Sequence, residues 1–138
     1  MKKLSEDAML QLLEATSADR DLLARRMAPA LDHKTADWLA KRVQDRSFNV
    51  TTVCRDGQKL GAIWWWYSAS NSCLVLNAGA SFTKNIDTTP AFFAAYEILA
   101  HQVGAKSIEL STARAGVAKV YRAAGWIVEG VNLRLFLT

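Results

Sequence analysis

The segments GAKSIEL (residues 104–110) and AKVYRAAGW (residues 118–126) indicate how the C-terminal half of the chain is built. Gly104 and Gly125 each close a run of helical periodicity, because glycine readily adopts the left-handed conformation that ends a helix. A short apolar run typical of a strand follows Gly104. The predicted elements are a strand at residues 106–111, a helix at 113–124 and two strands at 126–128 and 132–137 about a turn at Glu129-Gly130.

A further helix precedes Gly104. Pro90 suits the first turn of a helix, where its missing N–H is not needed, and Thr89 is the candidate N-cap. Apolar residues then recur at the spacing of one helix face, at Phe92, Tyr96, Leu99 and Val103. The second half therefore alternates helix and strand, as α/β domains do.

Three strands are predicted in the middle of the chain. Residues 49–55 alternate and are rich in β-branched side chains, Asp56-Gly57 is a strong turn signal, and residues 60–67 resume as a strand. Residues 73–78 form the third strand, which completes an antiparallel meander whose central members have the apolar composition of strands buried on both faces.

Four consecutive aromatic residues lie within this meander. On a strand, Trp64 and Trp66 face one way while Trp65 and Tyr67 face the other. We expect core packing of a central strand between helix layers. The alternative is that one face lines a substrate or partner groove.

The first third has helical periodicity. Ser5 can cap a helix that carries Met9, Leu12 and Leu13. A second apolar stripe, Leu22, Leu23 and Met27, runs towards Pro29, and a third helix from about Asp32 places Ala36, Leu39, Ala40 and Val43 on one face.

Composition bounds the class of protein. A chain of 138 residues with 51% apolar and 22% charged residues is expected to form one globular domain, residues 1–138. The start of the chain lacks the apolar stretch of a signal peptide, and the apolar run at 62–67 is too short to cross a membrane, so we expect a soluble, cytoplasmic protein. Cys54 and Cys73 are expected to be buried, reduced thiols.

This order of elements resembles the GNAT superfamily of N-acetyltransferases, in which the segments quoted above match the closing pattern of a Gly-terminated helix, a strand, and a helix ending in Tyr-x-x-x-Gly-aromatic, here Tyr121 to Trp126. The implied fold class is α/β (α+β): a GNAT-like mixed central sheet with N-terminal helices, a three-strand antiparallel meander and then α-β-α-β-β. Short, divergent chains of this kind look similar to those encoded by bacteriophages.

The resemblance implies transfer of an acetyl group from acetyl-CoA to an amine, with Tyr121 at the position of the family's usual acid. Glu109, on the strand at 106–111, is a weaker candidate for a catalytic role. The other interpretation of Tyr121 is structural, because Val117, Tyr121 and Ala124 share one helix face, where a tyrosine commonly packs its ring.

The resemblance places the cofactor between the strand end, with backbone amides of Asn77, Ala78 and Gly79, and a loop at residues 84–89. Family members cradle the pyrophosphate with glycines at this loop, and both are absent here. Lys84, Thr88 and Thr89 can still hold an anion, but Asp87 places a carboxylate there and Pro90 removes an amide donor. The alternative is an ordinary capped helix start.

Two functions stay open from the sequence. One is an acyl-CoA-dependent N-acyltransferase acting on a small-molecule or protein amine, and the other is a catalytically silent GNAT-like binding or assembly module. A homo-oligomer fits either function. Nucleic acid is not indicated, because the net charge of +4 is scattered along the sequence, and His33 and His101 lack the spacing of metal ligands.

Overall fold

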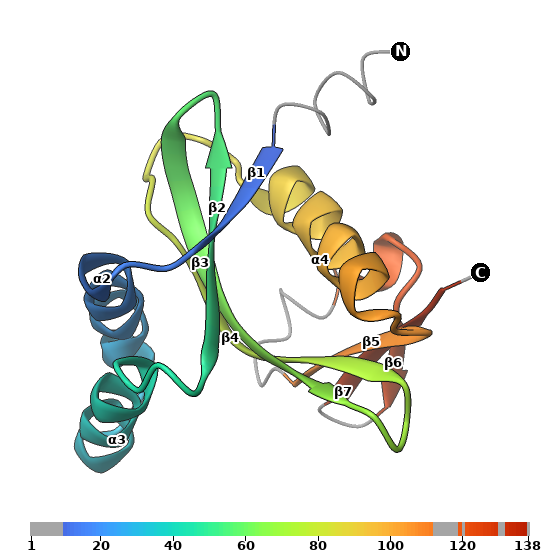
Figure 1. The fold of residues 1–138 in the computed structure, drawn as a ribbon, viewed down its shortest axis with the longest axis horizontal. Coiled ribbons are helices and arrows are strands. Elements are labelled where there is room, and N and C mark those ends of the chain that lie inside the picture. Colours follow the sequence, from blue (N-terminus) through green and yellow to red (C-terminus); the bar gives the residue numbers. More distant parts are fainter. Residues whose placement is uncertain (1–9, 112–118, 120, 130–131, 138) are drawn as a thin grey trace. The chain divides into compact units, whose positions relative to one another are not determined.

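The computed structural model describes residues 10–111, 119, 121–129 and 132–137, which belong to two compact units. The first unit comprises Met1–Trp65 and Ala78–Ala95, and the second comprises Trp66–Asn77 and Tyr96–Thr138. Figure 1 labels the helices and strands.

Three antiparallel strands run through the first unit: β1 (Leu10–Glu14), β2 (Asn49–Arg55) and β3 (Gln58–Ser68). In register, Leu10 pairs with Arg55 of β2, and Asn49 of β2 pairs with Trp65 of β3. Asp56 and Gly57 both have positive φ angles, 52° and 79°, and form the tight turn that their sequence predicts. The predicted hairpin is confirmed.

The helix expected around Leu12 and Leu13 is wrong, because these residues belong to the strand β1. Leucine favours helices, but propensity is a weak preference that tertiary pairing overrides. Here Leu12 pairs with Val53 and Leu13 with Thr52, so the backbone hydrogen bonds of this segment go to β2 and not to a helical turn. Ser5 and Met9 lie outside the described residues.

Two helices follow β1, α2 (Ser17–Met27) and α3 (His33–Val43), with a short 3₁₀ turn η1 (Ala28–Ala30) between them. Thr16 and Asp19 form a reciprocal capping box at the start of α2, in which each side chain accepts the other residue's backbone N–H. Asp32 accepts the N–H of Thr35 at the start of α3, so the helix expected from about Asp32 is confirmed.

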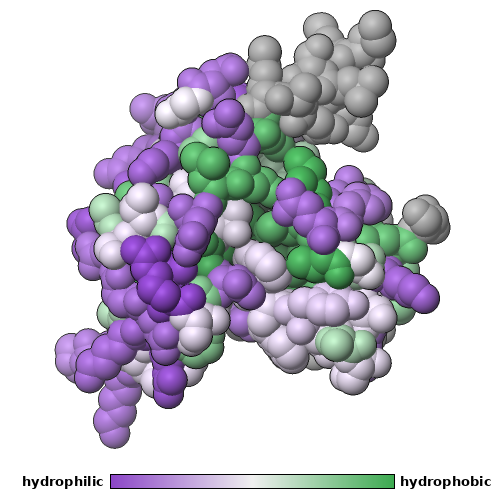
Figure 2. Space-filling model, viewed as in Figure 1, coloured by the Kyte–Doolittle hydropathy of each residue, from purple (hydrophilic) through white to green (hydrophobic). Residues whose placement is uncertain are grey.

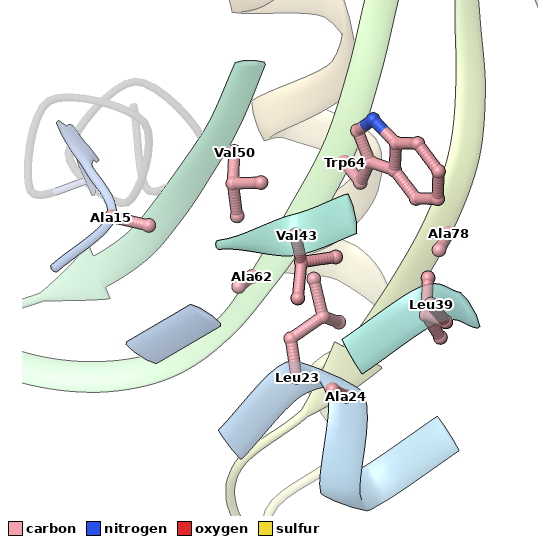
Figure 3. Packing of buried hydrophobic residues seen from close by; sticks show 9 residues of the cluster. All are labelled: Ala15, Leu23, Ala24, Leu39, Val43, Val50, Ala62, Trp64 and Ala78. Carbon is pink, nitrogen blue, oxygen red and sulfur yellow. The ribbon is translucent and has the colours of Figure 1, made fainter. Parts of the chain in front are cut away.

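Both helices bury one face against the strands of the first unit. Figure 3 shows the cluster, in which side chains of α2 and α3 meet those of β2, β3 and β4 (Cys73–Ser81). Its members are Ala15, Leu23, Ala24, Leu39, Val43, Val50, Ala62, Trp64 and Ala78. The surface over α2 and α3 is mainly hydrophilic (Figure 2).

The aromatic run on β3 is only partly a core feature. Trp64 is 7% exposed and belongs to the cluster, as expected, but Trp66 is 47% exposed. The expectation of a strand buried on both faces is therefore wrong at Trp66.

The remaining elements are α4 (Thr89–Val103), β5 (Ser107–Ser111), β6 (Ile127–Glu129) and β7 (Asn132–Phe136). In the second unit, β4 pairs in parallel with β5, while β5 pairs antiparallel with β7 and β7 with β6. The strand order through the described residues is β1-β2-β3-β4-β5-β7-β6, a mixed sheet. Gly104 and Gly125 have φ angles of 74° and 99°, as expected of helix-ending glycines. Most of the helix predicted at 113–124 lies outside the described residues, although residues 121–123 are helical.

Cys54 and Cys73 are both free and buried, as the sequence predicts. Burial raises the pKa of the Cys54 thiol. Among the described residues, no helix combines the length and the apolarity that a membrane crossing needs.

A single buried arginine ties the helices of the first unit to β2. Arg20 of α2 is 1% exposed and donates to the carbonyl oxygens of Val43 (2.7 Å), Asp45 (3.1 Å) and Phe48 (3.2 Å). These carbonyls belong to the C-terminal end of α3 and the turn after it, where backbone acceptors lack helical partners. The guanidinium therefore caps the C-terminal end of α3 and stabilises the turn between α3 and β2.

We expect Arg20→Met to lower the free energy of unfolding by about 3 kcal/mol, because one buried and two part-buried carbonyls lose a charged donor. Arg25→Met is the matched control: Arg25 lies on the same helix, but its contact with Asp21 is exposed, so its loss costs at most about 0.5 kcal/mol. Urea unfolding followed by circular dichroism measures both. Equal losses of stability in the two variants would show that the hydrogen bonds of Arg20 contribute no more than the exposed ion pair of Arg25.

Gly61 marks a close approach within the first unit. A Cβ atom added at Gly61 would collide with the carbonyl oxygen of Ala80 and with the ring of Phe92, 2.5 Å from its Cζ atom. At Gly79 the nearest contact of an added Cβ is the Ala62 carbonyl oxygen at 3.6 Å, an ordinary distance.

Gly61→Ala is therefore expected to destabilise the protein by about 1–3 kcal/mol through overpacking, while Gly79→Ala should change stability by less than about 0.5 kcal/mol. Thermal and urea unfolding of the two variants distinguish these effects. A Gly61→Ala variant as stable as the wild type would mean that β3 and α4 separate more easily than their packing indicates.

Candidate functional site

Two tyrosine hydroxyl groups meet in the second unit. Tyr96 of α4 and Tyr121 lie with their oxygens 3.1 Å apart, within hydrogen-bond distance. The Trp126 ring packs edge-on against both, with ring centroids 5.1 Å from Tyr121 and 6.4 Å from Tyr96. Tyr96 and Trp126 are buried and Tyr121 is partly buried. Two residues of the closing sequence motif, Tyr121 and Trp126, thus form an aromatic cluster with Tyr96.

Burial sets the protonation state of this pair. Desolvation raises the pKa of Tyr96 well above 10, and the neighbouring Tyr121 adds to the shift. Desolvation also raises the pKa of Tyr121, although the hydrogen bond with Tyr96 works in the opposite direction. Both phenols therefore stay neutral at physiological pH, and Tyr121 can act as a hydrogen-bond donor that is held in place by Tyr96.

Glu109 lies on β5 and is partly buried. In register it pairs with Val75 of β4 on one side and with Arg134 of β7 on the other. Ile108, its neighbour on the strand, is fully buried, while Leu110 on the other side is partly buried, as Glu109 is. The catalytic role considered for Glu109 stays a prediction.

The strand end expected to contact a thioester lies where the pairing of β4 with β5 runs out. The parallel register extends from Cys73↔Ser107 to Leu76↔Leu110, and β5 ends at the next residue. Asn77 follows Leu76, and its side chain is exposed. Along β4, Ala78 then points into the core of the first unit and Gly79 is exposed.

The loop between β4 and α4 holds its own carboxylate at the helix start. Asp87 Oδ1 accepts the backbone N–H of Thr89 at 3.0 Å, and this hydrogen bond lowers the pKa of the Asp87 carboxyl. The Thr88 carbonyl accepts the N–H of Phe92, so Thr89 lies inside the helix, and its expected role as N-cap is wrong. Lys84 is exposed and Thr88 is buried.

Sequence reasoning misses two of these contacts. Tyr96 falls in an apolar stripe, although a tyrosine on a buried helix face usually needs a partner for its hydroxyl group. Asp87 reads first as an obstacle to phosphate, whereas aspartate two residues before a helical N–H is a common turn-forming signal. Among the described residues, no three His, Cys, Asp or Glu side chains gather as a metal site would require.

The architecture is shared with solved acetyltransferases. An acetyltransferase of the GNAT family from Desulfovibrio desulfuricans matches with a TM-score of 0.71 and 13% identity over 94% of this chain and 99% of its own. Ard1 from Thermoplasma volcanium matches with a TM-score of 0.63 and 14% identity over 94% of this chain and 99% of its own. The PaiA N-acetyltransferase from Thermoplasma acidophilum, solved in complex with coenzyme A, matches with a TM-score of 0.59 and 12% identity over 91% of this chain and 96% of its own.

At such identities the likeness concerns the fold, and the chain has the α+β fold of the GNAT acetyltransferases with a mixed central sheet. The fold class expected from the sequence is confirmed. No family model matches the chain, and no curated protein matches its sequence.

Because burial raises the pKa values of Tyr96 and Tyr121, we expect both phenols to ionise at a higher pH than an ordinary tyrosine. Tyr67→Phe leaves Tyr96 and Tyr121 as the two tyrosines of the chain. We expect this variant to show well under half of its final phenolate absorbance at about pH 10, the ordinary tyrosine pKa. Because the fold favours the neutral phenols, their contribution to stability is complete below about pH 10 and is lost as the pH rises through the raised pKa values.

Ultraviolet absorbance, with circular dichroism at each pH to confirm the native state, measures the titration. Half ionisation at about pH 10 in folded protein would contradict the buried placement of the pair.

Proposed function

We propose that this chain is a GNAT-type acyl-CoA-dependent N-acyltransferase acting on an amine. The observation that carries the proposal is the fold itself, which spans more than nine-tenths of this chain in common with acetyltransferases, one of them solved with coenzyme A. We further propose that residues 1–138 act as one domain in the cytoplasm, where acetyl-CoA is available.

In this reaction a neutral amine attacks the thioester carbonyl, a C–N bond forms and the C–S bond breaks. The nitrogen loses one proton and the departing sulfur gains one. We assign Tyr121 the role of stabilising the departing sulfur. A phenol with a raised pKa keeps its own proton, but it donates a hydrogen bond to the developing thiolate, which then takes its proton from solvent water. Its hydrogen bond with Tyr96 keeps that hydroxyl group in place.

The cofactor contacts follow from the same proposal. Backbone amides of Asn77, Ala78 and Gly79 polarise the thioester carbonyl, and Lys84, with the hydroxyl groups of Thr88 and Thr89, meets the phosphates. Glu109 of β5, which pairs in register with Val75 of β4, is our candidate to accept the amine proton, directly or through water. The acceptor is an amine of a small molecule or of a protein, since similar folds include an aminoglycoside 6′-acetyltransferase and an enzyme that modifies an N-terminal serine of a ribosomal protein.

A second candidate function rests on Asp87. Its carboxylate already occupies a helix-start amide that a pyrophosphate would use in this type of loop, and its negative charge repels phosphate. This contact favours a catalytically silent GNAT-like module that serves in binding or assembly, for example a phage-encoded one.

Asp87→Asn separates the two functions. Asparagine keeps an acceptor oxygen for the Thr89 N–H but removes the charge, so we expect acetyl-CoA to bind about tenfold more tightly than to the wild type. Asp56→Asn, which removes the same charge from the exposed hairpin turn, is the control and should leave the affinity unchanged. Isothermal titration calorimetry with acetyl-CoA measures all three proteins.

Tyr121→Phe tests the chemistry. We expect acetyl-CoA to bind it as tightly as the wild type, while thiol release falls about 100-fold. The acceptor panel contains a polyamine, an aminoglycoside and a peptide with a free N-terminal serine. Absence of binding to both wild type and Asp87→Asn at millimolar acetyl-CoA would refute the acyltransferase and leave the silent module.

A further inference from the structure

An exposed tryptophan lies among cations on α3. Trp38 is 49% exposed, and Lys34, Lys41 and Arg42 are exposed at the fourth position before it and the third and fourth positions after it. These offsets place all four side chains on one flank of the helix, away from Leu39 and Val43, which are buried. We call these four residues the Trp38 surface.

The Trp38 ring is held from within the first unit. Its centroid lies 5.8 Å from that of Trp64, at an interplanar angle of 43°, and the Arg42 guanidinium lies over it at 5.5 Å. Trp64 is itself buried in the core cluster and packs edge-on against Phe48 at 5.5 Å. The indole is therefore supported by Trp64 while about half of the Trp38 side chain stays exposed.

The charge on this flank is positive. Asp37 is the acidic residue within α3, and its carboxylate lies 3.6 Å from the His33 ring nitrogen, on the neighbouring flank of the helix. Arg42 thus lies over the ring, and Lys34 and Lys41 are exposed about one turn from Trp38 on the same helix. The basic residues look scattered in the sequence, but α3 carries three of them within one turn of an exposed aromatic residue.

We propose that the Trp38 surface binds single-stranded nucleic acid. Cations meet the phosphates and the indole, or the guanidinium plane beside it, stacks on an unpaired base. Lys34 and Arg42 are eight residues apart, about 12 Å along the helix, so the cations are spread along the helix axis. A duplex hides its base faces, and an acidic peptide supplies charges without a ring to stack.

The proposal goes beyond the acyltransferase and does not depend on it, since it uses α3 and β3 residues and no cofactor contact. The test is fluorescence anisotropy of a labelled oligothymidine of about 20 nucleotides, longer than common single-strand site sizes, between about 50 and 200 mM salt. We expect Lys34→Ala/Lys41→Ala to weaken binding and to reduce the salt slope by about 0.7 for each phosphate that the variant no longer neutralises.

Trp38→Ala should weaken binding at least fivefold. Trp66→Ala is the matched control, because Trp66 is 47% exposed and lies outside the Trp38 surface. Lys106→Ala, which removes an exposed lysine of the second unit, is the charge control. Circular dichroism verifies that each variant is folded, and the double lysine variant keeps the test decisive if Trp38→Ala is unstable.

Three outcomes would overturn the proposal: no binding at low salt, equal losses in the control variants, or equal affinity for duplex DNA of the same length. Competition by polyglutamate as strong as that by unlabelled oligothymidine would also overturn it, because it would identify a surface for acidic polypeptides.

Discussion

The buried guanidinium of Arg20 is the constraint on which the first unit depends. The C-terminal end of α3 and the turn after it present carbonyl oxygens without helical partners, and the Val43 carbonyl belongs to a buried residue. Arg20 supplies several fixed donors from a single side chain, and its charge suits the negative end of the α3 dipole. Burial lowers the pKa of Arg20, but an arginine stays charged inside proteins. The orientation of α3, and hence of Trp38, follows from this contact.

The sequence predicted local structure well where one short segment contained the whole signal. The helix start near Asp32, the Asp56-Gly57 turn and the helix-ending Gly104 each depend on a few neighbouring residues. Predictions were wrong where a distant partner decides. Residues 10–14 look helical until β2 pairs with them, and no local pattern tells that Trp66 stays exposed while Trp64 is buried.

The candidate site shows the same division. The position of Tyr121 followed from a motif near the C-terminus, but its partner Tyr96 is 25 residues earlier, on another helix. A hydrogen bond between two such hydroxyl groups leaves no periodic trace in the sequence. Asp87 is the reverse case. Its effect is local, because an aspartate two residues before a helical N–H can accept that N–H, whereas the missing glycines give no sign of this hydrogen bond.

The two buried thiols have a practical consequence for spectroscopy. Cys54 and Cys73 are the only cysteines of the chain, and neither is accessible to a bulky thiol reagent in the folded state. Thiolate is the reactive form, and burial disfavours it at Cys54. A single cysteine placed on an exposed position of α3 is therefore the site that a maleimide dye labels first, and the native chain serves as its own unlabelled background.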